Sequence, residues 1–368
     1  MGFNCGIVGL PNVGKSTLFN ALTETAAAEA ANFPFCTIEP NTGRVAVPDK
    51  RLVTIADIAK PETVVPTHLE FVDIAGLVRG ASKGEGLGNQ FLGNIRAVDA
   101  ICHVLRCFED SGVTHVEETV DPVRDAETVT TELMLADLES LERRSEPLRK
   151  KVQGGVKDKD AARELDLMER ALVLLRDGKP ARLAERAPDE EKAFRALQLL
   201  TSKPVLYVCN VDEDAAADGN AYSAQVAEMA AAEGAESVVI SAKIEAELAA
   251  LDDDAEKAEF LETLGLEETG LARVIQAGYR LLGLITFFTQ GPNEARAWTV
   301  AQGTRAARAA GGIHSDFERG FIAAETIAYD EFTGLGGEQA AKDAGRMRAE
   351  GRDYLVKDGD IILFRFNV

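Results

Sequence analysis

A phosphate-binding pattern lies close to the start of the chain. Residues 9–16 read Gly-Leu-Pro-Asn-Val-Gly-Lys-Ser, which matches G-x-x-x-x-G-K-[ST]. The glycines allow a tight turn whose N–H groups point inward, Lys15 can reach the β- and γ-phosphates of a nucleotide, and the Ser16 hydroxyl can ligate Mg²⁺. The residues of this segment predicted to bind a nucleotide are Asn12, Val13, Gly14, Lys15, Ser16 and Thr17. Lys15 is also the first candidate catalytic residue.

This pattern needs a strand before it and a helix after it, and the sequence offers both. The apolar run Cys5–Val8 precedes it, and Thr17–Leu22 begins a helix whose positive N-terminus would face the anion. We therefore expect an α/β fold with its ligand at the carboxyl ends of parallel strands.

Two further segments have the spacing of nucleotide-sensing switches. Thr37 lies in a proline-bounded loop, residues 32–41, and could contact Mg²⁺ beside the γ-phosphate. Residues 69–72 form a strand that ends in Asp73-Ile74-Ala75-Gly76, where Asp73 would hold the water shell of Mg²⁺ and the Gly76 N–H would contact the γ-phosphate. The predicted metal ligands are Ser16, Thr37 and Asp73, and the predicted switch residues are Phe35, Thr37, Gly76 and Leu77.

Leu77 stands where switch GTPases carry the glutamine that orients the attacking water, so another group must do this. A glycine-rich stretch, residues 80–88, is interpreted as the second switch. His115 follows the buried strand Ala100–Arg106 in a polar loop and is a candidate catalytic residue, with a plain surface histidine as the alternative. His103, inside that strand, is predicted to be a core residue.

A base-reading segment follows the strand Val205–Cys209. Asn210-Val211-Asp212-Glu213 occupies the place of Asn-Lys-x-Asp in GTPases, with Val211 and Glu213 replacing the lysine and the aspartate that recognise guanine. This change disfavours guanine and suits adenine. The strand Ser237–Ile240 leads into Ser241-Ala242-Lys243, the expected closing wall of the base pocket. The predicted base-pocket residues are Asn210, Val211, Glu213, Ser241, Ala242 and Lys243.

Two heptad seams predict an antiparallel coiled-coil hairpin from about Val129, with its turn at Gly154-Gly155 and a kink or interruption at Pro147. A further helix is expected from 188–191 to about Leu200. Either a solvated helix face or an arm that contacts RNA or a partner explains the basic residues of the hairpin. These are Arg143, Arg144, Arg149, Lys150, Lys151, Lys157 and Lys159.

The C-terminal part predicts a small α+β domain. A helix over 271–281 leads to strands at 284–289 and 296–300, and Asp358-Gly359 marks a turn before a last alternating strand. The expected domains are residues 1–128 and 201–280 for the two parts of a nucleotide-binding domain, 129–200 for the helical insertion, and 281–368 for the C-terminal domain.

The composition of the chain limits its expected binding partners and cellular location. The 368 residues carry a formal net charge of −21, which argues against nonspecific binding to DNA or RNA. Any RNA contact would need a local basic patch. The chain has five cysteines without metal-binding spacing, and we see no signal region or membrane-spanning run. We expect a cytoplasmic monomer that binds neither membranes nor DNA.

Residues 12–16, 32–41, 73–88 and 210–213 together closely resemble the YchF family, the Obg-like ATPases of the translation-factor class of P-loop proteins, and the resemblance covers nearly the whole chain. Residues 311–322 and 350–360 look like that family's TGS domain, a β-grasp fold. The resemblance implies a P-loop NTPase domain of Ras-like type, ATP preferred over GTP, slow hydrolysis and association with ribosomes or ribosomal RNA. Asn12 resembles the asparagine of K⁺-activated relatives, so K⁺ is a further expected cofactor.

The motifs thus predict a Mg²⁺-dependent ATPase that works as a nucleotide-dependent switch and binds GTP more weakly, and the resemblance implies that it acts at the ribosome. Phosphoryl transfer would depend on positioning and charge neutralisation by Lys15 and Mg²⁺. Two alternatives stay open: a GTPase translation factor, and a binding adaptor that nucleotide merely stabilises.

Overall fold

The computed structural model describes residues 3–30, 42–74, 87–110, 119–154, 158–251 and 253–367. The chain forms two compact units. Unit 1 comprises Met1–Phe3, Arg44–Glu70 and Ile275–Val368, and unit 2 comprises Asn4–Gly43 and Phe71–Val274. Each unit is described by itself.

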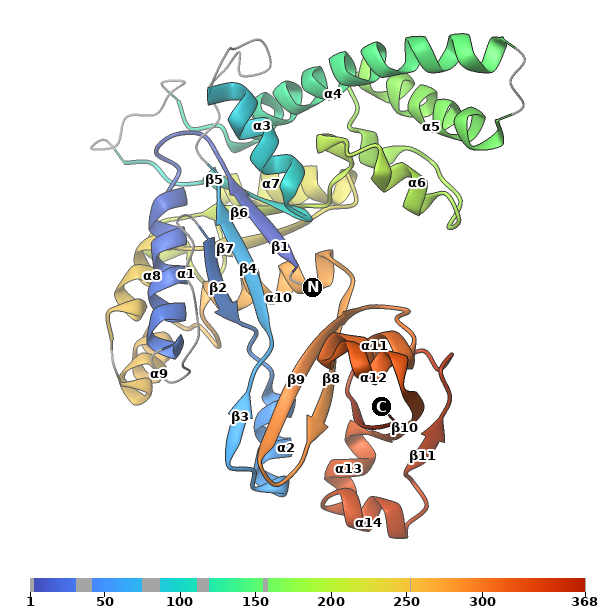
Figure 1. The fold of residues 1–368 in the computed structure, drawn as a ribbon. Coiled ribbons are helices and arrows are strands. Elements are labelled where there is room, and N and C mark those ends of the chain that lie inside the picture. Colours follow the sequence, from blue (N-terminus) through green and yellow to red (C-terminus); the bar gives the residue numbers. More distant parts are fainter. Residues whose placement is uncertain are drawn as a thin grey trace. The chain divides into compact units, whose positions relative to one another are not determined.

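The nucleotide-binding pattern belongs to a six-stranded sheet of order β2-β4-β1-β5-β6-β7 (Figure 1). The pairs β1–β5, β5–β6 and β6–β7 are parallel. All residues of β5 and β6 are buried, as expected for strands covered by helices on both faces. The strands are β1 (Asn4–Val8), β2 (Thr42–Ala46), β4 (His68–Asp73), β5 (Ala100–Arg106), β6 (Val205–Asn210) and β7 (Glu236–Ile240).

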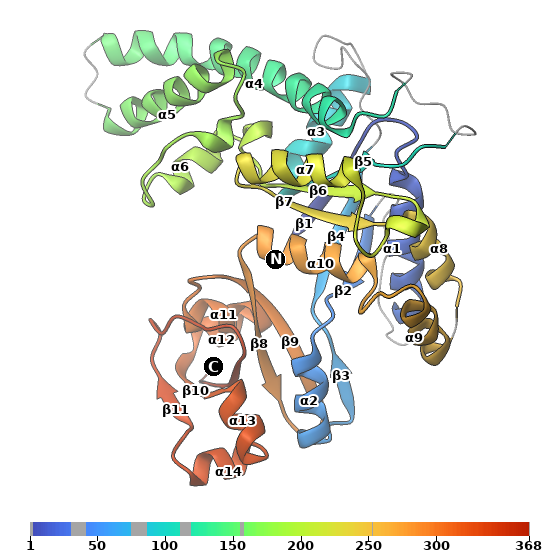
Figure 2. The same cartoon turned by 180° about the vertical axis from the view of Figure 1, so that it is seen from behind.

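Helices α1, α4 and α7 contact strands of this sheet, and Figures 1 and 2 both show α1 and α8 side by side. Because parallel strands end at one edge, the loops after β1, β5, β6 and β7 meet there. The helices are α1 (Lys15–Ala30), α3 (Leu87–Ala97), α4 (Pro122–Gln153), α5 (Lys159–Arg176), α6 (Glu191–Ala196), α7 (Ala221–Ala232), α8 (Ala242–Ala249), α9 (Asp254–Thr263) and α10 (Gly270–Leu281).

Helices α4 and α5 lie side by side as a hairpin (Figures 1 and 2). Its core is a cluster that includes Leu141 of α4 and Met168 and Leu172 of α5. The prediction that Pro147 interrupts α4 is wrong, because the helix continues to Gln153. The ring of Pro147 lies on the exposed face, where water can satisfy the carbonyl group that loses its helical partner.

The helix expected to reach Leu200 is shorter than predicted. Helix α6 covers only Glu191–Ala196, and a 3₁₀ turn follows at Leu200–Ser202. Gln198 separates them because its φ of +54° is left-handed and cannot continue a helix.

Unit 1 is built on a second six-stranded sheet of order β11-β10-β12-β8-β9-β3. One buried cluster contains Phe287, Ile362 and Phe364, and another contains Phe288, Ile327 and Ile361. Successive residues of β8 and of β12 belong to different clusters, so the sheet is covered on both faces. Its strands are β3 (Thr63–Val65), β8 (Leu284–Gln290), β9 (Glu294–Ala301), β10 (Phe321–Ala328), β11 (Arg348–Glu350) and β12 (Asp360–Phe366). Its helices are α2 (Lys50–Ala59), α11 (Ala306–Ile313), α12 (Ser315–Arg319), α13 (Tyr329–Leu335) and α14 (Glu338–Asp343).

An early segment completes unit 1. Strand β3 pairs in parallel with β9, and Leu52 and Ile55 of α2 are buried against Phe288 and Phe332. Arg51 donates to Asp358 at 2.6 Å, across 307 residues of sequence. The assignment of four consecutive domain segments stays a prediction.

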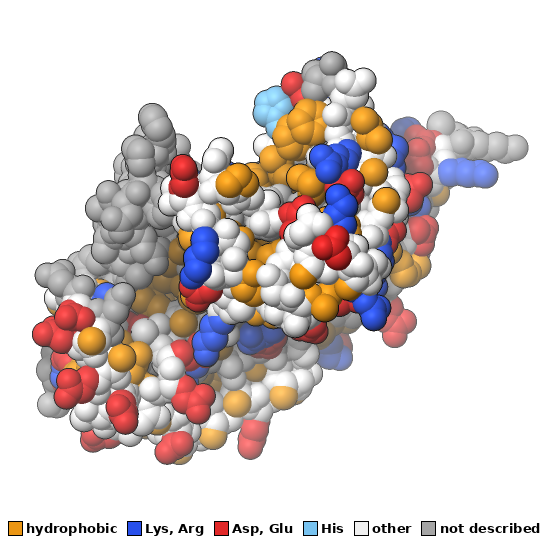
Figure 3. Space-filling view, turned by 90° about the horizontal axis from the view of Figure 1, so that it is seen from below, with side chains coloured by type: hydrophobic (Ala, Val, Ile, Leu, Met, Phe, Trp, Pro, Cys, Tyr) orange, Lys and Arg blue, Asp and Glu red, His pale blue; other side chains and the backbone are white. Residues whose placement is uncertain are grey.

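Charged side chains of both signs are mixed on the face drawn in Figure 3, where Lys and Arg lie among Asp and Glu. Within the described ranges, none of the helices has the length and apolar character needed to cross a membrane.

Candidate nucleotide-binding site

The phosphate-binding pattern forms a tight loop between β1 and α1. Asn12 and Gly14 both have a left-handed backbone, with φ of +64° and +92°. A Cβ at Gly9 would lie 2.8 Å from the carbonyl oxygen of Val104, so the loop passes close to β5. The Leu18 N–H donates to the Gly14 carbonyl at 2.9 Å, which starts the ladder of α1. The first N–H groups of α1 are thus presented at the loop.

Asn210 joins the predicted phosphate and base segments. Its Nδ2 donates to the Val13 carbonyl at 3.0 Å, and its Oδ1 accepts from the Ala242 N–H at 2.9 Å. The side chain is buried, and a Cβ at Gly14 would collide with Nδ2. The second glycine of the loop is therefore required by this contact as well as by its φ. Three segments that are far apart in sequence meet at this one amide.

Lys15 and Asp73 form an ion pair between the loop and the end of β4. Their side chains are 11% and 20% exposed, so the pair is largely shielded from water. Ser16 and Thr17 lie on the first turn of α1 and are exposed. A hydroxyl and a carboxylate at this edge are the oxygen donors that Mg²⁺ prefers, directly or through water. The described residues therefore fit a hydrated Mg²⁺.

The base-reading segment and its closing wall are held together by side chains and backbone. The Val211 N–H donates to the Ile240 carbonyl at 2.8 Å, and Lys243 donates to Glu213 Oε1 in an ion pair. This bond to Lys243 lowers the pKa of Glu213, and the same contact raises the pKa of Lys243. Val211 is only 2% exposed, so what this residue offers at the surface is mainly its backbone, and its role in base recognition stays a prediction.

Ser241 and Ala242 are also buried, as the end of β7 and the start of α8. The Ser241 Oγ has no hydrogen-bond partner among the described residues. A buried hydroxyl without a partner is costly, and a ligand or water would relieve this cost.

Phe35, Thr37, Gly76, Leu77 and His115 lie outside the described residues. The segment before His115 is described as far as Asp110. Arg106, 2% exposed, donates from Nε to the Phe108 carbonyl at 3.1 Å and from a terminal nitrogen to the Asp110 carbonyl at 3.2 Å. Asn220 donates to the Cys107 carbonyl at 2.6 Å. Neither Arg106 nor Asn220 was among the predicted site residues, although the charge of Arg106 at the end of an apolar strand is a usable signal.

His103 is confirmed as a core residue. It is 2% exposed and lies against Tyr207, with ring centroids 5.8 Å apart. Burial lowers its pKa to about 3, so the imidazole is neutral at pH 7.

The basic residues of the hairpin are paired with acidic neighbours. Arg149 bonds Glu169 at 3.0 Å, Lys150 bonds Glu146 at 3.0 Å and Lys151 bonds Asp158 at 2.8 Å. Arg143 and Arg144 lie 3.7 and 3.9 Å from Glu139 and Glu164. Of the two interpretations left open above, a mixed-charge solvated face describes these five residues better than a bare basic patch. Lys159 is exposed, and Lys157 lies outside the described residues.

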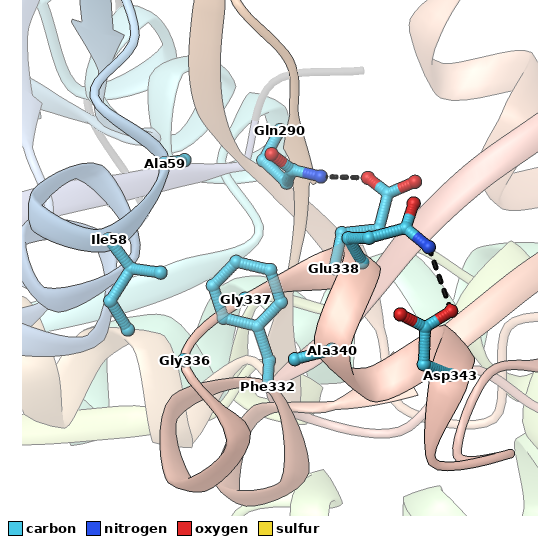
Figure 4. Close-up of a pocket in the computed structure, with 10 residues that line it drawn as sticks. Ile58, Ala59, Gln290, Phe332, Gly336, Gly337, Glu338, Ala340 and Asp343 are labelled. Atoms are coloured by element: carbon cyan, nitrogen blue, oxygen red, sulfur yellow. Dashed lines mark hydrogen bonds between the residues drawn. The ribbon is translucent and has the colours of Figure 1, made fainter.

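Unit 1 has a cavity of about 470 Å³ (Figure 4). Ile58 of α2 and Phe332 of α13 lie on one side of it, and Gln290 donates to Glu338 on another (Figure 4). It contains none of the predicted nucleotide-binding residues.

Comparisons with known proteins cover the whole chain. A family model described as "50S ribosome-binding GTPase" matches residues 4–136, and the model YchF-GTPase_C, described as "Protein of unknown function (DUF933)", matches residues 284–367. The chain is 57% identical over 368 residues to a protein of Escherichia coli O157:H7 named "Ribosome-binding ATPase YchF", with both chains fully covered. It is 54% identical over 370 residues to the protein of that name in Bacillus subtilis strain 168, again with both chains fully covered.

Among solved structures, the YchF GTPase of Schizosaccharomyces pombe matches with a TM-score of 0.89 and 37% identity. That match covers 99% of this chain and 98% of the other. The chain is a P-loop nucleoside triphosphatase of mixed α/β fold. This follows from the parallel sheet, from the loop between β1 and α1, and from these matches. More narrowly, the chain belongs to the YchF family.

Proposed function

We propose that this chain is a Mg²⁺-dependent ATPase that binds ribosomes according to its nucleotide state. The observation that carries the proposal is the convergence of the phosphate loop, Asn210 and residues 241–243 at one edge of the sheet. Ribosome binding and ATP are suggested by the printed name of the relatives in Escherichia coli O157:H7 and Bacillus subtilis.

In this mechanism the phosphates of ATP compete with Asp73 for Lys15. The loop N–H groups and Lys15 bind and orient the β- and γ-phosphates, and the oxygen atoms of Ser16 and of the released Asp73 would hold Mg²⁺ directly or through water. Bound Mg²⁺ supplies charge neutralisation on the phosphates. Thr37 and the Gly76 N–H are proposed to contact the γ-phosphate. Phe35 belongs to the same switch as Thr37, and Leu77 belongs to the same switch as Gly76.

Water activation is assigned to His115, because Leu77 offers no polar group for it. Asn12 is proposed to hold K⁺ near the β–γ bridge. Its left-handed φ of +64° supports an alternative role in shaping the loop, since asparagine tolerates that conformation well. Rates measured in K⁺ and in Na⁺ for Asn12→Ala separate the two roles.

Adenine is the proposed base. A guanine fork needs an aspartate and a lysine where this chain has Glu213 and Val211. A GTPase is the second candidate, because the family model for residues 4–136 and the Schizosaccharomyces pombe structure are both named as GTPases. We also propose a TGS fold for residues 281–368, a cytoplasmic location and a monomeric state.

The first test is a competition of ATP and GTP for the purified protein in the presence of Mg²⁺. We expect ATP to bind more tightly by at least about tenfold, or about 1.4 kcal/mol. Lys15→Ala should abolish tight binding of either nucleotide by removing a charge-assisted contact of about 2–4 kcal/mol. Lys179→Ala, an exposed lysine paired with Asp177, is the control. Unchanged ATP affinity in folded Lys15→Ala would refute the site assignment.

The second test is co-sedimentation with ribosomes in the presence of ADP or of a non-hydrolysable ATP analogue. We expect the bound fraction to differ between the two states. Equal binding in both states, with hydrolysis that ribosomes do not accelerate, would favour a binding adaptor instead.

A further inference from the structure

The ion pair between Glu213 and Lys243 connects two segments that carry predicted base-pocket residues. Glu213 begins the 3₁₀ turn Glu213–Ala215 after β6, and Lys243 lies on the first turn of α8. The same two segments are also joined by the bond from the Ala242 N–H to the side chain of Asn210. Asn210 lies three residues before Glu213, and Ala242 lies one residue before Lys243. The ion pair therefore forms a second bridge, closer to solvent, with side chains 39% and 66% exposed.

The bridge engages one particular carboxylate oxygen. Lys243 Nζ donates to Glu213 Oε1. A carboxylate recognises guanine by accepting from N1–H and from the exocyclic amine at once, which needs both of its oxygens free and aligned. With Oε1 engaged by an ammonium, the carboxylate of Glu213 is partly neutralised and held by Lys243, so it is a weaker and less well aligned double acceptor for guanine.

Adenine makes a different demand on the same group. Its Watson–Crick edge presents one amine donor and one ring acceptor, so a single free oxygen satisfies the donor. The ring acceptor would be repelled by a bare carboxylate and is better tolerated beside a neutralised one. The ion pair thus weakens the binding of guanine more than the binding of adenine. The preference arises because the wrong base is disfavoured.

We propose that Lys243 is a specificity-determining residue, which favours ATP over GTP by occupying Glu213. This rests on the proposed function of the site as an adenine-nucleotide pocket. The effect belongs to Lys243 and not to Glu213 alone, so a chain with the same Asn-Val-Asp-Glu segment and no partner for the carboxylate would discriminate less.

The test measures dissociation constants of the β,γ-imido analogues of ATP and GTP with Mg²⁺ by calorimetry. Lys243→Met removes the ammonium and keeps the bulk, and we expect the preference for the ATP analogue to fall by about tenfold or more. Lys243→Arg keeps the ion pair and should retain the preference. The double variant Lys243→Met, Glu213→Gln lacks the freed carboxylate and should not gain GTP affinity.

A matched control is Lys179→Met, which removes another exposed, paired lysine of unit 2 outside the site. We expect it to bind both analogues as the unaltered chain does. Raising NaCl from 20 to 300 mM at a constant K⁺ concentration should weaken the preference of the unaltered chain, because the pair is exposed and salt screens it.

The outcomes are distinct. An unaltered chain that prefers the ATP analogue, with a Lys243→Met variant that keeps the full preference, overturns the inference and leaves the proposed function intact. An unaltered chain that binds neither analogue or prefers the GTP analogue overturns the proposed function, and the inference falls with it.

Discussion

Gly14 combines a φ of +92° with close contact to the Asn210 amide, where a Cβ would collide with Nδ2. We predict that Gly14→Ala lowers the free energy of unfolding by about 2–4 kcal/mol, because left-handed strain of about 1–2 kcal/mol adds to displacement of Asn210. It should also weaken ATP binding. Urea denaturation and a nucleotide titration measure the two effects.

Gly178 is the matched control for this substitution. Its φ is +70°, but a Cβ there would have no neighbour within 4 Å. Gly178→Ala should therefore lower the free energy of unfolding only by the cost of the left-handed backbone, and ATP affinity should stay unchanged. Equal effects of the two substitutions would mean that the contact with Asn210 contributes nothing.

His103 gives the protein an acid-sensitive core. Its pKa is about 3 in the folded chain and about 6.5 in the unfolded chain, so below pH 6.5 the unfolded chain binds the extra proton. This contribution to stability is complete above pH 6.5 and is lost by about 1.4 kcal/mol per pH unit as the pH falls toward 3. We predict that His103→Leu flattens the decline measured by urea denaturation from pH 6.5 to 4.5. An identical pH profile in the variant would contradict this assignment.

Sequence patterns identified much of the candidate site but not its internal contacts. The loop pattern located Lys15, and its spacing to later strands located Asn210 and Lys243. The ion pairs Lys15–Asp73 and Lys243–Glu213 depend on how strands far apart in sequence align, which a single sequence does not contain. The burial of Val211 depends on the same alignment.

At the scale of elements, α4 is tied to the approach to β6 by one buried carboxylate. Asp137 accepts from the N–H groups of Leu200 and Thr201, both at 2.8 Å, and from the Thr201 hydroxyl at 2.7 Å. Burial nevertheless raises the pKa of Asp137 above its ordinary value. We predict that Asp137→Ala costs about 2–4 kcal/mol, since three buried donors lose their acceptor.

Asp166→Ala is the control for that change, because Asp166 is an exposed residue of α5 paired only at the surface with Arg170. It should cost less than about 1 kcal/mol in thermal or urea unfolding. A similar small effect of Asp137→Ala would show that the 199–203 segment holds its place without the bonds to Asp137.

The spacing of apolar residues predicted well those helices and strands whose bounds depend on the local sequence. Strand β5 and helix α10 were located within a residue of their observed bounds. The errors have local causes that pattern does not reveal: a left-handed Gln198 ends one helix early, and an exposed Pro147 is tolerated in another. The association of α2 and β3 with unit 1 is a tertiary effect with no local signal.

At the scale of the molecule, unit 1 needs residues from both ends of the chain. Leu52 and Ile55 are at most 4% exposed, and burial of each side chain contributes about 1.5–3 kcal/mol. Domains are stable by only about 5–15 kcal/mol in total. We predict that a fragment of residues 275–368 shows no cooperative urea transition and no near-ultraviolet circular dichroism signal of ordered packing.

The full chain serves as the reference for that experiment, and a fragment that carries 44–70 joined to 275–368 by a flexible linker should regain the transition. Cooperative unfolding of the shorter fragment would mean that α2 and β3 are dispensable for the core of unit 1.

The pairing of β3 with β9 also sets an order of events during biosynthesis. Thr63 bonds the carbonyl group of Asn293, a residue made 230 positions later. The apolar side chains of Leu52 and Ile55 on α2 therefore stay exposed to solvent while nearly all of unit 2 is synthesised and folds. Such long-range closure is slow, so unit 1 should be the last part of a newly made chain to acquire resistance to protease, and the part most dependent on chaperones.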